Sequence, residues 1–125
     1  MPDPFRLLKA ESMELTVSPR EGYVLASAAG RIDDSADRAF RDQLFALLAQ
    51  SGANVVLDLS QAKFISSHGI GYLVSLAAHA NTSASRLILA ACSPFVAIVL
   101  TRCKLDNFFE TADTVDAAVR RIQGQ

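Results

Sequence analysis

The stretch Val55–Ala80, VVLDLSQAKFISSHGIGYLVSLAAHA, decides the fold because it joins a short apolar run to an amphipathic run through a polar turn. The first run ends at Leu59, is rich in β-branched residues and is bounded by Gly52 and Ser60, which is typical of a fully buried strand. Such strands suit parallel sheets. Beyond Ile65 apolar residues recur at helical spacing, which predicts a helix whose apolar stripe lies on that sheet: Ile70, Leu73, Val74 and Ala77.

The start of this helix is predicted at Ser66. As N-cap, its hydroxyl can accept a hydrogen bond from the amide of His68 or Gly69. Ile65 and Ile70 then occupy the N′ and N4 positions of a hydrophobic staple. The pattern therefore predicts a well-defined boundary between the polar turn and the helix.

Ser67 is then the first helical residue, with a hydroxyl at the helix mouth. Free amide groups and the macrodipole favour an added negative group there. Gly69 and Gly71 are expected to leave the outer side of this turn bare, so that another surface can approach the backbone. Ser67 and His68 do not form a catalytic pair, because adjacent helical residues point about 100° apart. The residues therefore indicate a binding site and not an enzyme, and His68 is expected at its edge.

Composition agrees with one globular module. The chain has 125 residues, half of them hydrophobic, with 12 basic and 13 acidic side chains. This balance argues against direct nucleic-acid binding. No apolar run approaches the roughly 20 residues of a membrane span, and the N-terminus does not resemble a signal peptide, so a cytoplasmic protein is expected. Cys92 and Cys103 lack CxxC spacing, and no phosphate loop or calcium loop occurs, so no metal or cofactor is expected.

Residues before the central stretch predict a lead-in, a hairpin and a helix. Residues 1–12, with two prolines, are expected to form a poorly ordered lead-in to a single domain at 13–125. Residues 14–18 alternate at period two and 23–30 are extended, which predicts a hairpin with a loop longer than two residues. Asp33 or Asp34 is expected to cap the next helix, whose apolar face contains Phe40, Leu44, Leu47 and Leu48.

Residues after the central stretch repeat the alternation. Residues 86–90 predict a strand, and Ser93 and Pro94 the N-cap and N1 of a helix. A turn at 105–110 then leads to a short last strand and a closing helix over 114–119. The apolar face of the middle helix is expected to contain Phe95, Val96, Val99 and Leu100. The order ββαβαβαβα predicts an α/β fold with a mostly parallel sheet and an N-terminal antiparallel hairpin.

The segment LDLSQAKFISSHGIGYL resembles the signature of the STAS domain, the fold of bacterial anti-sigma factor antagonists. The usual form is a strand, then Phe-Ile-Asp-Ser-Ser-Gly-Leu-Gly, then a helix. In that family a partner serine kinase phosphorylates the first Ser after the Asp. Alignment on Phe64, Gly69 and Gly71 places this phosphoacceptor at Ser67. Two residues depart from the family, because Ser66 replaces its Asp and His68 its second Ser.

The resemblance extends over almost the whole chain. Gly30-Arg31-Ile32-Asp33 is similar to the family's Gly-x-Leu-Asp, which implies that Asp33 contacts the partner. The segment SPFVAIVLTRCKLDNFFE is similar to the family's Ser-Pro-x-Val helix, Gly-Leu turn and final strand, although Lys104 stands where Gly is common.

The resemblance implies a non-enzymatic regulator that binds an ATP-binding serine kinase acting as anti-sigma factor. Phosphorylation of Ser67 would release the complex and a serine phosphatase would restore it, while ATP and magnesium belong to the kinase. The alternative is a STAS scaffold of a stressosome-like assembly, or an accessory subunit of a transporter, in which the serine need not be modified.

Overall fold

The computed structural model describes residues 13–124, through which one six-stranded sheet runs. The lead-in predicted for residues 1–12 lies outside the described residues. The order of neighbours is β1-β2-β3-β5-β6, with β4 paired to β2. The pair β1–β2 is antiparallel and the other pairs are parallel, which confirms the predicted mixed α/β sheet with an antiparallel hairpin at its start. The strands are β1 (Glu14–Arg20), β2 (Tyr23–Ile32), β3 (Asn54–Asp58), β4 (Ala62–Ile65), β5 (Arg86–Ala90) and β6 (Thr111–Ala112).

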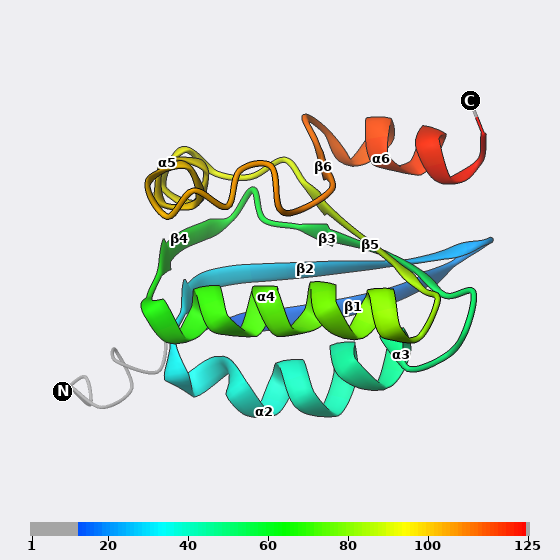
Figure 1. Cartoon of the computed structure of the whole chain (residues 1–125), viewed down its shortest axis with the longest axis horizontal. Coiled ribbons are helices and arrows are strands. Elements are labelled where there is room, and N and C mark those ends of the chain that lie inside the picture. Colours follow the sequence, from blue (N-terminus) through cyan, green and yellow to red (C-terminus); the bar gives the residue numbers. More distant parts are fainter. Residues whose placement is uncertain (1–12, 125) are drawn as a thin grey trace, which may run out of the picture.

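Helices cover both faces of the sheet, as Figure 1 shows. The segment 34–48 and α4 lie on one face, and α5 and α6 lie on the other. The segment 34–48 is made of η1 (Asp34–Ala36), α2 (Asp37–Ala39), η2 (Phe40–Phe45, with π-helical turns) and α3 (Ala46–Leu48). The later helices are α4 (Ser67–Thr82), α5 (Pro94–Arg102) and α6 (Val115–Ile122).

The core lies on both sides of β3, because the alternate residues of this strand point to opposite faces. Val55 and Leu57 belong to the apolar cluster that includes Leu73 of α4, whereas Val56 belongs to the cluster that includes Ala118 of α6. The side chains of Val55, Val56 and Leu57 are fully buried. The prediction of a strand buried on both faces is therefore confirmed, as is the buried face of the first helical segment at Phe40, Leu44 and Leu48.

The hairpin loop is shorter than predicted. Arg20 pairs directly with Tyr23, so the loop contains only Glu21 and Gly22. Gly22 has φ +85°, a left-handed conformation that glycine adopts without steric cost and that lets the chain reverse in two residues.

The strand order also contains one element that the expected order lacked, the short strand β4. After β3 the chain turns tightly at Ser60, whose amide donates to Asp58 Oδ1 at 2.9 Å, and then resumes beside β2. Strands β3 and β4 thus follow one another along the same edge of β2, β3 beside residues 24–27 and β4 beside residues 30–32, and the register of the second pairing shifts after Gly30. As a result, the end of β4 lies beside the end of β2, and α4 begins at that point.

Candidate functional site

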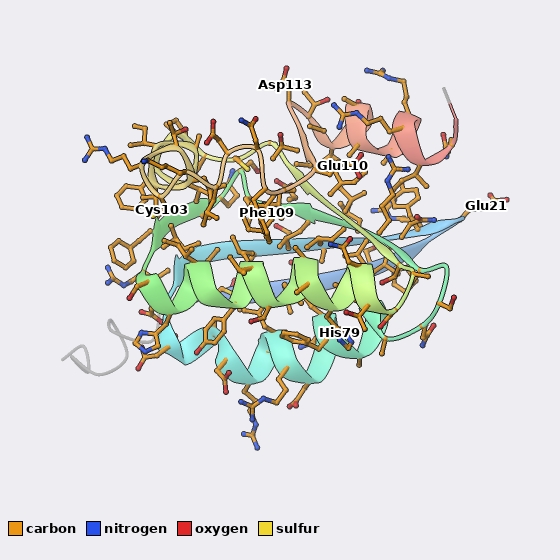
Figure 2. The ribbon with its side chains drawn as sticks, in the orientation of Figure 1. Glu21, His79, Cys103, Phe109, Glu110 and Asp113 are labelled. Atoms are coloured by element: carbon orange, nitrogen blue, oxygen red, sulfur yellow. The ribbon has the colours of Figure 1, made fainter. Side chains whose placement is uncertain are left out.

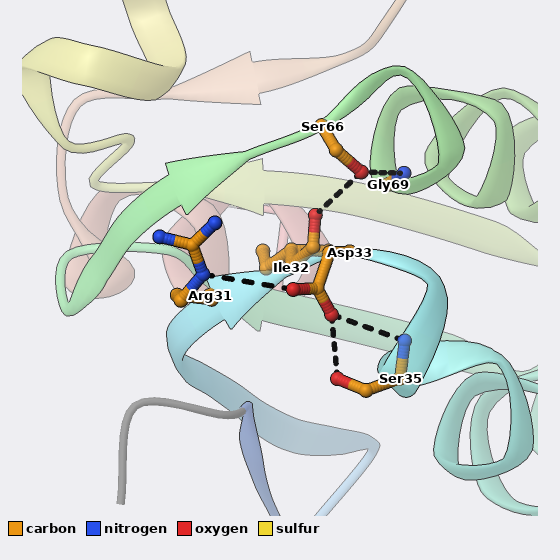
Figure 3. Close-up of polar contacts among 6 residues, drawn as sticks. All are labelled: Arg31, Ile32, Asp33, Ser35, Ser66 and Gly69. Atoms are coloured by element: carbon orange, nitrogen blue, oxygen red, sulfur yellow. Dashed lines mark hydrogen bonds and ion pairs between the residues drawn. The ribbon is translucent and has the colours of Figure 1, made fainter. Parts of the chain in front are cut away.

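The site is built where α4 begins, against the last residue of β2. Ile65 of β4 pairs with Ile32 of β2, and the next residue, Ser66, donates its amide to the Ile32 carbonyl at 3.0 Å. This backbone bond holds the first turn of α4 at the end of the sheet. Figure 3 shows the resulting cluster, in which Ser66 lies above Ile32 and Asp33 follows on the next segment.

Ser66 caps α4, as predicted. Its backbone is extended, and its Oγ accepts a hydrogen bond from the Gly69 amide at 3.2 Å. The hydroxyl also lies 3.5 Å from the Ile32 carbonyl, which it can reach as a donor. Ser67 is the first residue of α4, and its side chain is exposed together with that of His68. An accessible hydroxyl therefore stands at the positive end of a 16-residue helix.

The two glycines of the first turn have different roles, and the prediction that both leave its outer side bare is wrong for Gly69. Gly69 is buried and faces the end of β2. A Cβ there would overlap the Ile32 carbonyl oxygen and would lie 2.8 Å from Ile65 Cγ1. A Cβ on Gly71 would meet nothing within 4 Å, and Gly71 is exposed. Only Gly71 opens the outer surface, while Gly69 allows the helix to pack against β2.

Asp33 caps the segment after β2 and remains beside the start of α4. Its Oδ1 accepts bonds from the Ser35 amide at 3.0 Å and the Ser35 hydroxyl at 2.5 Å, and its Oδ2 lies 3.6 Å from Arg31 Nε. The bonds from Ser35, helped by the Arg31 guanidinium, hold the pKa of the Asp33 carboxyl below its usual range. A carboxylate is therefore ionised at neutral pH next to the Ser66 turn, although Ser66 itself replaces the acidic residue of the family signature.

The second histidine, His79, and the two cysteines lie outside this cluster. His79 is packed at a ring-centroid distance of 5.4 Å on Phe45, and Figure 2 shows it between α4 and the segment below. Within residues 13–124, no group of three or more His, Cys, Asp or Glu side chains is placed to hold a metal ion. Both cysteines are free; Cys92 is half-buried, which raises the pKa of its thiol, and Cys103 is exposed. Each helix described between residues 13 and 124 is too short or too polar to cross a bilayer.

One feature near the site was missed from the sequence, an aromatic stack between β4 and α5. Phe95 was expected on the buried face of its helix, but it is 42% exposed. Its ring lies 5.5 Å from that of Phe64, and the Arg31 guanidinium carbon lies 4.1 Å from the Phe64 centroid. The buried face of α5 contains Val96 and Leu100, four residues apart. That spacing alone could have indicated that Phe95 lies at the border of the face.

Comparison with known proteins identifies the family. The family model described as "STAS domain" matches residues 14–118, so the chain belongs to the STAS domain family. A curated relative, a STAS-domain containing protein of Pseudomonas aeruginosa, is 30% identical over 104 residues, which cover 83% of this chain and 93% of that protein.

Solved structures of anti-sigma factor antagonists share the fold. One from Mycobacterium paratuberculosis has a TM-score of 0.79 and 23% identity, with coverage of 98% of this chain and 99% of that one. The anti-sigma factor antagonist SpoIIAA in its unphosphorylated form has a TM-score of 0.72 and 23% identity, covering 91% and 98%. The phosphorylated form of Bacillus SpoIIAA has a TM-score of 0.66 and 21% identity, covering 89% and 99%.

Proposed function

We propose that this chain is an anti-sigma factor antagonist whose binding to a serine kinase is switched by phosphorylation of Ser67. The observation that carries the proposal is the accessible Ser67 hydroxyl at N1 of α4, directly after the capping Ser66. This is the position of the phosphoacceptor in the family signature. That SpoIIAA is known in phosphorylated and unphosphorylated forms on the same fold supports it.

A phosphate at this position weakens binding at the interface but does not destabilise the fold. It adds about −1.5 to −2 charges at neutral pH. At an exposed helix N-terminus such a charge is favourable by roughly 0.3–1 kcal/mol. In an interface the same group loses water, and against an acidic or apolar surface this costs several kcal/mol. A net loss of roughly 3–4 kcal/mol weakens binding on the order of a hundredfold or more.

The partner in this proposal supplies all of the chemistry. The unphosphorylated chain binds an ATP-binding serine kinase that holds a sigma factor or another regulator, and displaces that cargo. The kinase uses its own ATP and magnesium to modify Ser67, and a separate serine phosphatase reverses the step. Asp33, His68 and Gly71 surround the acceptor and form the contact surface, while Ser66 and Gly69 hold the turn in place. The chain itself acts as a non-enzymatic cytoplasmic module.

The direct test is incubation with candidate serine kinases from the same genome and Mg-ATP, followed by peptide mapping. We expect one phosphate, on Ser67. A matched control is Pro94→Ser, which creates the same Ser-Ser pair at the start of α5, where no acceptor is proposed. Phosphate on Ser66, or equal modification of Ser67→Ala, contradicts the proposal.

Affinity is the second half of the test. Calorimetric titration into the kinase should show that Ser67→Ala binds like the unmodified chain, and that the phosphorylated chain binds on the order of a hundredfold more weakly or worse. Ser67→Asp should reproduce part of this loss, because it carries a single charge on a shorter side chain. Unchanged affinity of the phosphorylated chain contradicts the switch.

One observation favours a second candidate function. Ser66 and His68 replace two residues of the family signature, and the first replacement removes a carboxylate from the segment that a kinase would recognise. A STAS scaffold in a stressosome-like assembly, or an accessory subunit of a transporter, needs no modification of Ser67. In that case a stable complex forms with its partner and is indifferent to Ser67→Asp.

A further inference from the structure

An exposed apolar stripe runs from the candidate site onto α5. It contains Arg31, Phe64, Phe95, Ile98 and Arg102, and we call it the α5 stripe. Phe95 and Ile98 are 42% and 54% exposed, and both are among the few large hydrophobic side chains exposed on the described surface. On α5 the residues at 95, 98 and 102 follow the i, i+3, i+7 spacing of one helix side. The stripe is therefore continuous and not a set of scattered side chains.

Arg31 joins the stripe to the candidate site. Its guanidinium lies over the Phe64 ring at 4.1 Å, while its Nε lies 3.6 Å from the Asp33 carboxylate. Phe64 in turn packs against Phe95 at 5.5 Å. A partner that contacts the turn at Ser67 and Asp33 therefore meets the aromatic pair through Arg31.

The charges of the stripe are both positive and lie at its two ends. Arg31 is at the β2 end, with 44% of its side chain exposed, and Arg102 is at the last turn of α5, where it is also exposed. The three stripe residues between them, Phe64, Phe95 and Ile98, are apolar. Phenylalanine and arginine are both enriched in protein interfaces relative to the rest of the surface.

We propose that the α5 stripe is a docking surface for a protein segment with an apolar centre and acidic side chains at both ends, which belongs to the same partner that binds at Ser67. In this respect the inference rests on the proposed function and names the chemistry of its partner. The apolar centre covers Phe95 and Ile98, and the acidic ends pair with Arg31 and Arg102. The contribution of the stripe to the binding affinity does not depend on phosphorylation of Ser67.

A second copy of the chain fits this surface poorly. A two-fold interface is self-complementary, so two stripes would pack antiparallel and bring Arg31 of one copy against Arg102 of the other. Like charges placed opposite each other in an interface are unfavourable. An acidic partner segment forms favourable charge pairs at both ends of the stripe, whereas a second copy places like charges there.

The first test uses two synthetic peptides with the same apolar centre, one flanked by Asp and Glu and the other by Lys. They are titrated into isotopically labelled chain and followed by amide chemical shifts. The acidic peptide should shift the signals of β4 and α5 with a dissociation constant on the order of 1 mM or below, and the basic peptide should bind at least tenfold more weakly. Phe95→Ala and Arg102→Glu should each weaken the acidic peptide about tenfold. Phe108→Ala is the matched control, because Phe108 is equally exposed, at 50%, and lies outside the stripe.

The second test uses the kinase that modifies Ser67 and separates the two proposals. If the stripe variants lose affinity and Ser67→Asp does not, the docking surface stands and the switch fails. If Ser67→Asp loses affinity and Phe95→Ala binds as tightly as Phe108→Ala, the docking surface is overturned and the switch stands.

Three results, from peptide titration, sedimentation equilibrium and vesicle binding, would each overturn the docking surface, and none of these experiments needs the kinase. The first is equal binding of the acidic and basic peptides. The second is a Phe95-dependent dimer in sedimentation equilibrium, which makes a second copy the occupant. The third is Phe95-dependent binding to phosphatidylglycerol vesicles without binding of the acidic peptide, which makes a membrane the occupant.

Discussion

Helices α4 and α5 begin with the same capping arrangement, yet their surroundings differ. Ser66 accepts a bond from the amide of Gly69 at 3.2 Å, and Ser93 accepts one from the amide of Val96 at 3.3 Å. Ser93 is buried and its hydroxyl also donates to the Ala62 carbonyl at 2.6 Å. Ser66 is only half-buried, and its hydroxyl lies 3.5 Å from the Ile32 carbonyl oxygen. The start of α5 is therefore a structural joint between two elements.

The residue after each cap completes the difference. Pro94 follows Ser93 and has neither a hydroxyl nor an amide hydrogen to offer a ligand. Ser67 follows Ser66 and presents an exposed hydroxyl. The comparison teaches that an N-cap serine by itself indicates only a helix boundary. A candidate site needs the accessible group at N1 as well, and only α4 has it of these two helices.

The largest effect is expected from Gly69→Ala, which breaks the joint between α4 and β2. The added methyl would overlap the Ile32 carbonyl oxygen, which also accepts the Ser66 amide, so backbone has to move. We expect a loss of roughly 3 kcal/mol or more in the free energy of unfolding. Urea denaturation measures it.

Gly71→Ala is the control for this change. It lies in the same turn, where a Cβ meets nothing within 4 Å. In a helix interior, alanine is about 1 kcal/mol more favourable than glycine, so this variant should be neutral or more stable. Equal losses in the two variants would mean that Gly69 does not face β2.

A smaller and graded effect is expected from the two caps. Ser93→Ala removes the hydroxyl that bonds both the buried Ala62 carbonyl and the Val96 amide, which costs about 2–3 kcal/mol. Ser66→Ala removes a half-exposed cap and should cost about 0.5–2 kcal/mol. Ser67→Ala should cost far less than either, because its hydroxyl caps nothing. If Ser67→Ala matched Ser66→Ala in chemical melts, the helix would start elsewhere.

The beginnings of the helices could be predicted from the sequence, because a cap is a local signal. Ser66 and Ser93 were assigned from residue type and position, and Asp33 was one of two candidates; each of the three has the expected bond to a nearby amide. The two-faced burial of β3 followed from an apolar run of the right length. The acceptor at Ser67 and the contact roles of its neighbours came from resemblance and stay predictions.

The ends of the helices were harder to predict from the sequence, because two helices end without the glycine that commonly follows a helix. Ala84 and Lys104 follow α4 and α5 with φ of 56° and 59°, a left-handed conformation that costs a non-glycine residue about 1–2 kcal/mol. After α5, the amide of Leu105 bonds to the Leu100 carbonyl at 2.8 Å, which closes the helix in spite of Lys104.

Strand β4 and the direction of Gly69 depend on tertiary contacts. Only four residues long, β4 is defined by its pairing with β2 and carries no period of its own. Gly69 looked equivalent to Gly71 in the sequence, and only the approach of the Ile32 carbonyl distinguishes them. Phe95 likewise depends on where Phe64 lies.

The smallest expected effect is that of a negative charge at Ser67 on the isolated chain, and its sign decides how the proposed switch works. A carboxylate introduced by Ser67→Asp lies at the positive end of α4 and should stabilise the fold by about 0.3–1 kcal/mol at low salt. Ser83→Asp is the matched control, because Ser83 caps the opposite, negative end of the same helix and the same change there should destabilise the fold by a similar amount.

The effect should also depend on pH with a definite sign. The helix favours the ionised form of the new carboxyl at position 67, so its pKa in the folded chain lies below its unfolded value of about 3.9. The added stability is therefore fully present above that pH and is lost as the pH falls through the lower folded pKa. Thermal melts at low and high salt, near neutral pH and below pH 4, would show it. A phosphate at Ser67 should likewise stabilise the isolated chain, so that loss of partner binding arises in the interface. A large drop in melting temperature would instead mean that phosphate acts by unfolding the first turn of α4.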